Sequence, residues 1–114
     1  MKIEKFEDIL AWQKAQKLTL FVYKTFRNNK DFGFKNQIER AAVSVMNNIA
    51  EGFERQTNKE LTNFLFIAKG SCGEVRSMLY VALELKCITK ADFDEMYKMS
   101  VEISKMLSGL IKTL

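Results

Sequence analysis

The sequence predicts an all-α fold, an antiparallel four-helix bundle with up-down-up-down order. The 114 residues include no proline, so little in the chain forbids long helices. Apolar residues recur at spacings of three and four in four separate segments, which is the period of an amphipathic helix. Only a few residues separate these segments, so successive helices must be antiparallel neighbours. A hydrophobic content of 47% suffices for one core, and we expect a single domain over residues 1–114.

The first two helices are predicted over residues 8–28 and 34–54. Each has a continuous apolar face, which we expect to point into the core. In the first helix this face consists of Ala11, Ala15, Leu18, Val22 and Phe26, and in the second of Ile38, Ala41, Ala42, Val45, Ile49 and Phe53.

The last two helices each begin with a capping signal. Thr57-x-x-Glu60 is typical of a capping box and starts a helix at residue 57 or 58 that continues to about residue 86. Thr89-x-x-Asp92 starts the fourth helix in the same way. The predicted core rows are Leu61, Phe64, Ala68, Ser71, Val75, Met78, Ala82 and Leu85 in the third helix, and Phe93, Met96, Ser100, Ile103, Leu107, Leu110 and Leu114 in the fourth.

Histidine is absent, and this excludes several classes of enzyme. A Ser-His-Asp or Cys-His nucleophilic site, the Glu-x-x-His pairs of di-iron bundles and the Arg-to-His motif of helical-bundle ribonucleases all require it. The glycines of Gly70-Ser71-Cys72-Gly73 lie within a helical pattern that lacks the Lys-Ser/Thr of a P-loop. The acidic residues 92, 94 and 95 lie in a helix's first turn, where negative charge favours the helix dipole. We therefore predict no enzymatic activity, no cofactor and no metal.

Two further features concern the cellular compartment. Cys72 and Cys87 have no C-x-x-C spacing, and we expect two free thiols in a reducing environment. No stretch approaches the roughly 18 to 20 uncharged apolar residues of a membrane span, and the first residues lack the apolar run of a signal peptide. We expect a cytoplasmic protein.

Basic side chains are concentrated on the first helix. Lys14, Lys17, Lys24 and Arg27 occupy its side opposite the core face. Six cationic residues and one acid lie between residues 14 and 35, a local balance of +5 in a chain of net charge +4. Such a stripe is suited to neutralising phosphates, so it predicts salt-sensitive, sequence-independent binding of nucleic acid. The alternative is a solvated helix face.

Several motifs carry a resemblance to a known family. They are Arg40-Ala41-Ala42, Asn48-Ile49-Ala50-Glu51-Gly52, Arg55, Phe64, Ala68, Gly70-Ser71 and Glu74, with Phe6 and Ala11-Trp12-Gln13-Lys14-Ala15 near the start. With these residues the chain resembles, over nearly its whole length, small bacterial four-helix-bundle proteins. They include proteins encoded in intervening sequences of large-subunit ribosomal RNA genes and the accessory variability determinant of diversity-generating retroelements.

The resemblance carries implications for assembly and partners. The retroelement protein is a basic homopentamer that binds nucleic acid and its reverse transcriptase. The resemblance therefore implies a pentamer here, an RNA or DNA backbone as ligand and a protein partner such as a reverse transcriptase. The heptads alone permit a dimer, a tetramer or other assemblies.

The resemblance also favours a network of polar residues between helices over a solvated helix face. Asn48 borders the apolar face of the second helix and is placed to bond across helices, while Glu51 and Arg55 are spaced as an i,i+4 pair. Glu74 flanks the core row of the third helix, so we expect a cationic partner for it, Arg40 or Arg55. If these two arginines are not paired in this way, we expect them to join the basic face.

The small residues Gly70 and Ser71 are predicted to let the third helix approach a neighbouring helix closely. A bulky side chain at either position would push the two backbones apart. Their role on this interpretation is structural.

Large apolar residues outside the predicted core indicate a partner surface. Leu20 and Phe21 lie among the basic positions, and Phe66 and Tyr80 point away from the third helix's core row. Two hypotheses follow. The favoured one is a non-catalytic homo-oligomer that contacts the backbone of RNA or of an RNA-DNA hybrid. The alternative is an oligomeric protein-interaction scaffold whose basic face only keeps it in solution.

Overall fold

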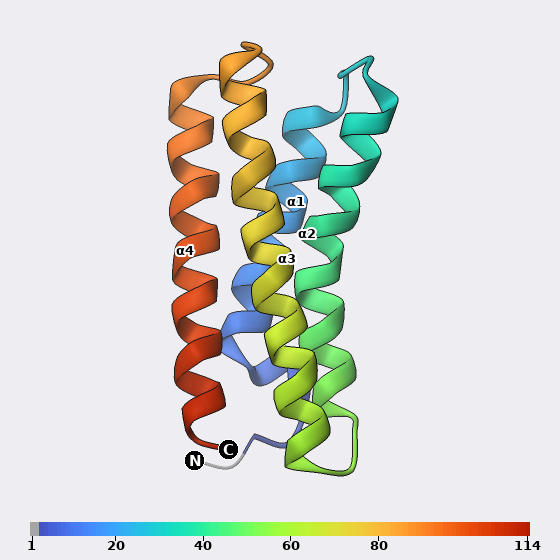
Figure 1. The fold of residues 1–114 in the computed structure, drawn as a ribbon, viewed down its shortest axis with the longest axis vertical. Helices are drawn as coiled ribbons and strands as arrows, with labels where there is room; N and C mark the ends of the chain where they lie inside the picture. The colour runs from blue at the N-terminus through green and yellow to red at the C-terminus, as the bar shows by residue number, and fades with distance from the viewer. Residues whose placement is uncertain (1–2) are drawn as a thin grey trace.

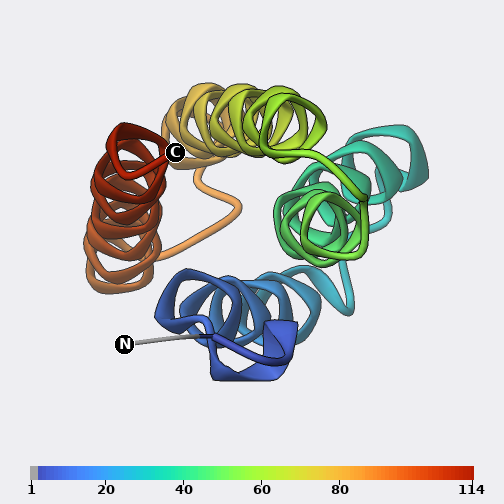
Figure 2. The same ribbon diagram turned by 90° about the horizontal axis from the view of Figure 1, so that it is seen from below.

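The computed structural model describes residues 3–114 and confirms the four-helix bundle. A short 3-10 helix, Phe6–Asp8, precedes α1 (Leu10–Phe26), α2 (Phe32–Phe53), α3 (Asn58–Glu84) and α4 (Lys90–Lys112). Consecutive helices run in opposite directions along a body of 43 × 22 × 19 Å (Figure 1). Seen from the end, the helices form a ring in which α1 and α3 each lie between α2 and α4 (Figure 2).

The helices begin where side chains satisfy their free backbone N–H groups. Asp31, Thr57 and Thr89 each accept a hydrogen bond from the backbone N–H three residues later, so both predicted threonine caps are confirmed. The first helix starts two residues later than predicted because residues 6–8 form the separate 3-10 turn. None of the helices in residues 3–114 is long and apolar enough to cross a membrane.

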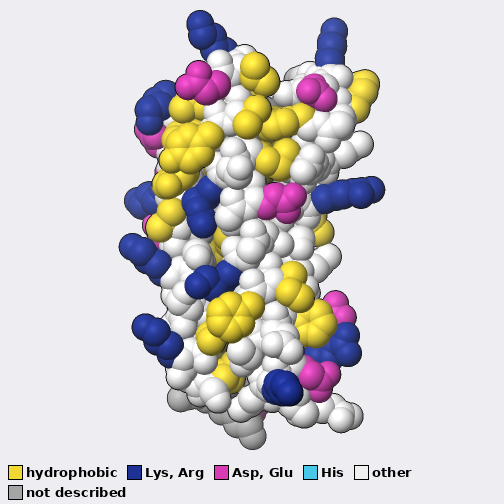
Figure 3. Space-filling view, in the orientation of Figure 1, with side chains coloured by type: hydrophobic (Ala, Val, Ile, Leu, Met, Phe, Trp, Pro, Cys, Tyr) yellow, Lys and Arg dark blue, Asp and Glu magenta, His cyan; other side chains and the backbone are white. Residues whose placement is uncertain are grey.

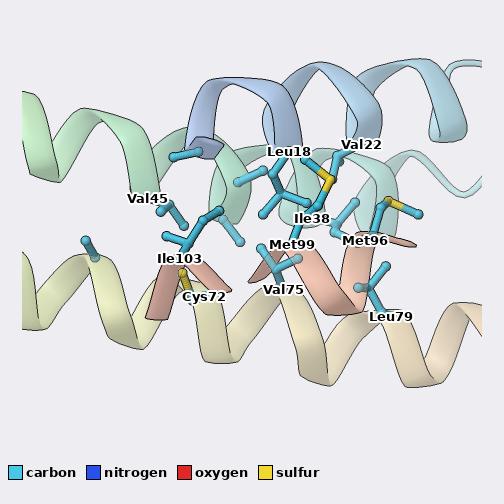
Figure 4. Close-up of a cluster of buried hydrophobic side chains, with 14 of the residues drawn as sticks. Leu18, Val22, Ile38, Val45, Cys72, Val75, Leu79, Met96, Met99 and Ile103 are labelled. Atoms are coloured by element: carbon cyan, nitrogen blue, oxygen red, sulfur yellow. The ribbon is translucent and has the colours of Figure 1, made fainter. Parts of the chain in front are cut away.

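The core lies along the centre of the ring and contains side chains from all four helices (Figure 4). The predicted face of α1 is confirmed at every position, and Thr19 is buried beside it. In α2 the predicted face is also buried except for Phe53, which is half-buried near the end of the helix.

The predicted core row of α3 is confirmed at Ala68, Ser71, Val75, Met78 and Ala82, with Leu61 and Phe64 half-buried, but it is wrong at Leu85 and misses a second buried row. Leu85 is 66% exposed, whereas Leu79, which was not predicted, is 0% exposed. The further members of the missed row, Leu65 and Cys72, are also buried. The predicted row followed the edge of α3 that faces α2. A helix between two neighbours also buries the row seven residues apart that faces the other neighbour. In α4, Met99 is buried while Leu110 is only half-buried and Leu114 is exposed past the helix end.

The two cysteines are both free and differ in exposure. Burial raises the pKa of the Cys72 thiol to about 11, and the nearby Arg76 and Lys69 only partly oppose this rise. Cys87 is exposed. Because the thiolate is the reactive form, we expect one thiol to react with a disulfide reagent at pH 8 in the folded protein and two after denaturation. Rapid reaction of both thiols without denaturant would contradict the burial of Cys72.

Candidate nucleic-acid interface

A groove with two lysines runs between α1 and the start of α4. It has a volume of about 520 Å³ and is lined by Lys17, Leu20, Phe21, Lys24, Thr25 and Asp92. Lys17, Leu20 and Lys24 are exposed, and Phe21 is half-buried in the groove. The first turn of α4 therefore brings a carboxylate, Asp92, to the edge of the predicted basic face. No ion pair within 4.0 Å joins that carboxylate to either lysine.

Lys14, which was predicted to belong to the basic face, is paired. Its ammonium group donates to a carboxylate oxygen of Glu102 on α4, and both side chains are half-buried. This hydrogen bond lowers the pKa of the Glu102 carboxyl, and the positive charges of Lys98 and Lys105 lower it further. The charge of Lys14 is thus compensated across the α1–α4 contact.

Lys98 and Lys105 extend the cationic surface onto α4, although the sequence pattern alone did not single them out. They lie seven residues apart with Glu102 between them, so all three occupy one side of the helix. This spacing of seven residues is the signal in the sequence that could have identified the two lysines. Figure 3 shows lysine and arginine side chains along the edge of the molecule over α4.

The three predicted arginines lie in different places. Arg27 is exposed directly after the last residue of α1. Arg40 is exposed on α2 in a hollow with Gly33, Asn36 and Gln37. Arg55 lies after α2. It pairs with Glu51 at 2.7 Å, lies 3.9 Å from Glu60 and stacks 4.9 Å above the ring of Phe64. Arg55 is therefore held between α2 and α3 and does not join the face of α1.

Asn48, Glu51 and Glu74 do not form the predicted network, because each contacts a different partner. Asn48 donates to the carbonyl oxygen of Ser44 at 2.7 Å and to its hydroxyl at 2.9 Å, and Ser71 of α3 donates to the same hydroxyl at 2.9 Å. The carboxylate of Glu51 accepts a hydrogen bond from Arg55, which confirms the predicted i,i+4 pair.

The expected pairing of Glu74 with an arginine is wrong. Glu74 is exposed and accepts from Gln37 at 3.5 Å. Gln37, Ser44 and Asn48 form the row of α2 that faces α3, because they recur at spacings of seven and four. Arg40 is exposed, and no carboxylate of the described residues lies within 4.0 Å of it.

The predicted close approach at Gly70 is also wrong. A Cβ atom at Gly70 would meet nothing within 4 Å, and the residue is exposed. The close approach is at Gly52, where a Cβ atom would lie 2.7 Å from Cβ of Phe64 and 3.1 Å from Cδ1 of Leu61. Ser71, the other predicted residue, is buried and bonds to Ser44 as described above.

This fold and these motifs match a described family. Residues 7–109 match the model of the 23S rRNA-intervening sequence protein family. The chain belongs to this family. A protein of unknown function from the S23 ribosomal protein family of Bacteroides thetaiotaomicron, with a crystal structure at 1.70 Å resolution, has the same fold. Its TM-score is 0.84 at 26% sequence identity, over 90% of this chain and 99% of that chain. None of the curated proteins matches the chain.

Membership in the 23S rRNA-intervening sequence protein family confirms the resemblance drawn from the sequence. The residues that match the family model, 7–109, cover nearly the whole length of the bundle. Neither the family description nor that of the solved structure names a catalytic activity.

Proposed function

We propose that this member of the 23S rRNA-intervening sequence protein family is a non-catalytic accessory protein that binds the backbone of RNA or of an RNA-DNA hybrid. The observation that carries the proposal is the outer side of α1. Lys17, Lys24 and Arg27 are exposed there, and no carboxylate in residues 3–114 lies within 4.0 Å of any of them. Cations without bound carboxylates are available to neutralise phosphates and release counterions.

The proposed contact is with the backbone and not with base edges. Lysine and arginine bonds to phosphate fix the position of a protein on a nucleic acid but carry no direct sequence information. Lys14 has a supporting role, because its pairing with Glu102 joins α1 to α4 behind the contact surface.

We further propose self-association, with five subunits as the resemblance implies. A net charge of +4 on one chain becomes a strong field when several copies present the same face. A protein partner, such as a reverse transcriptase, is the second candidate. It is favoured by exposed apolar residues on the side of α3 away from the core, Ile67, Val81 and Leu85. Mass measurement by light scattering separates one chain from an assembly.

The proposal is tested by removing the three charges of α1. We expect Lys17→Gln/Lys24→Gln/Arg27→Gln to weaken binding of a labelled RNA duplex at least about tenfold near 50 mM salt. The slope of log K against log salt should become less steep by about one unit for each lost contact. Fluorescence anisotropy measures both quantities.

A matched control removes three exposed lysines from other elements. Lys59→Gln/Lys86→Gln/Lys112→Gln lowers the net charge by the same amount. This control should keep most of the affinity. Equal losses in both variants would show that only net charge matters, and an unchanged α1 variant would remove α1 as the interface.

A further inference from the structure

A second pair of cations lies on α3 where it faces α4. Lys69 donates to the hydroxyl of Ser108 at 2.7 Å, and Arg76 has a buried Nη1 atom without a hydrogen-bond partner in residues 3–114. No carboxylate of the described chain lies within 4.0 Å of either cation. A buried donor without a partner is uncommon in folded proteins and calls for an explanation. Neither positive charge is therefore paired with a carboxylate in residues 3–114.

Two aromatic rings enclose these cations along the helix. Phe66 lies one turn before Lys69, whose ammonium is 6.0 Å from the ring centroid. Tyr80 lies one turn after Arg76. Its ring packs edge-on against Phe93 and Tyr97 of α4, with ring centroids 5.3 and 5.7 Å apart. Phe66 is 55% exposed and Tyr80 is 53% exposed, so both rings are available to a ligand.

The four residues, with Gly73 between them, form one row. Their spacings alternate between three and four, and the row extends about 21 Å at 1.5 Å per residue. A Cβ atom at Gly73 would lie 3.7 Å from Nη2 of Arg76, an ordinary contact distance, so the guanidinium lies beside the glycine. Figure 3 shows basic side chains lying between two apolar patches on this face. We call Phe66, Lys69, Arg76 and Tyr80 the α3 row.

We propose that the α3 row binds single-stranded nucleic acid, with bases stacked on Phe66 and Tyr80 and phosphates at Lys69 and Arg76. Aromatic faces combined with cations are the usual means of holding a single strand without reading its sequence. A duplex cannot use the rings, because its bases are already paired and stacked. The inference rests on the proposed function and adds to it a second site, on α3, that takes single strands.

The test compares labelled oligo(dT) and oligo(U) with a blunt RNA duplex. We expect Phe66→Ala/Tyr80→Ala to weaken single-strand binding about tenfold or more and to leave duplex binding unchanged. For single strands, Lys69→Gln/Arg76→Gln should make the slope of log K against log salt less steep by about 1.4, which is about 0.7 for each lost phosphate contact. Phe66→Tyr/Tyr80→Phe keeps both rings and should bind as the wild type does. Phe32→Ala removes an exposed ring from α2 and should have no effect.

The remaining outcomes distinguish failure of the α3 row from failure of the proposed function. If the α3 variants bind single strands normally while the α1 variant loses the duplex, the α3 row is overturned and the proposed function stands. If the wild type binds neither form, both proposals fall. Equal competition by poly-L-glutamate would indicate a site for acidic proteins and would overturn the inference. Loss of oligomer mass in the Phe66→Ala/Tyr80→Ala variant would assign the rings to subunit contacts and would also overturn it.

Discussion

Leu79→Ala is expected to lower the free energy of unfolding by about 2 to 5 kcal/mol, because it leaves a cavity in the core between α3 and its neighbours. Leu79 is fully buried and is one of the largest such side chains in the bundle. Leu85→Ala removes the same atoms from a residue that is 66% exposed, and its effect should stay within about 0.5 kcal/mol. Urea unfolding followed by circular dichroism at 222 nm gives both values.

The pair of variants tests whether Leu79, and not Leu85, belongs to the core. The prediction made from the sequence placed Leu85 in the core and omitted Leu79. A larger loss in Leu85→Ala than in Leu79→Ala would restore that prediction and contradict the burial of Leu79. Equal m-values in the two variants would show that the difference is one of stability and not of the surface exposed on unfolding.

Gly52→Ala is expected to lower the free energy of unfolding by about 1 to 3 kcal/mol, since overpacking forces neighbours to move. The new Cβ atom would lie 2.7 Å from Cβ of Phe64, an atom next to the backbone that cannot rotate away. Gly70→Ala adds the same atom where nothing lies within 4 Å, inside α3. It should raise stability by about 0.5 to 1 kcal/mol through the better helix propensity of alanine.

Thermal unfolding of the two glycine variants measures the contrast directly. The melting temperature should fall for Gly52→Ala and rise for Gly70→Ala. A higher melting temperature in both variants would mean that α2 and α3 move apart easily at Gly52. A lower melting temperature in both would mean that Gly70 is covered by a contact that the single bundle does not contain.

Local signals in the sequence predicted much of the fold. The capping threonines and the spacing of apolar residues located four helices to within a few residues, because these signals depend only on neighbours along the chain. The second buried row of α3, with Leu65, Cys72 and Leu79, was not predicted, since the sequence of this helix offers more than one apolar row. Which rows are buried depends on the positions of α2 and α4. The role of Gly52 was missed for the same reason, because nothing near it in the sequence shows that Phe64 lies opposite.

The candidate interface was predicted only in part, and the reason is distance along the chain. Counting charges between residues 14 and 35 gave a stripe of free cations. Lys14 is paired with Glu102, which lies 88 residues later and reaches it only when α4 packs against α1. Arg76 was not singled out because a lone arginine in a helix is ordinary in a sequence. What distinguishes it is a buried Nη1 atom that has no hydrogen-bond partner in the described residues.

The central claim, that exposed cations on this bundle bind nucleic-acid backbone, is tested most directly by the salt dependence of wild-type binding. Anisotropy of a labelled RNA duplex should be measured between about 50 and 200 mM salt, with the mass of the assembly determined in the same buffers. Three α1 contacts in one subunit predict that log K falls with log salt at a slope of about −2.7, and steeper if several subunits engage. Absence of binding near 50 mM, or an affinity that does not change with salt, would contradict the claim.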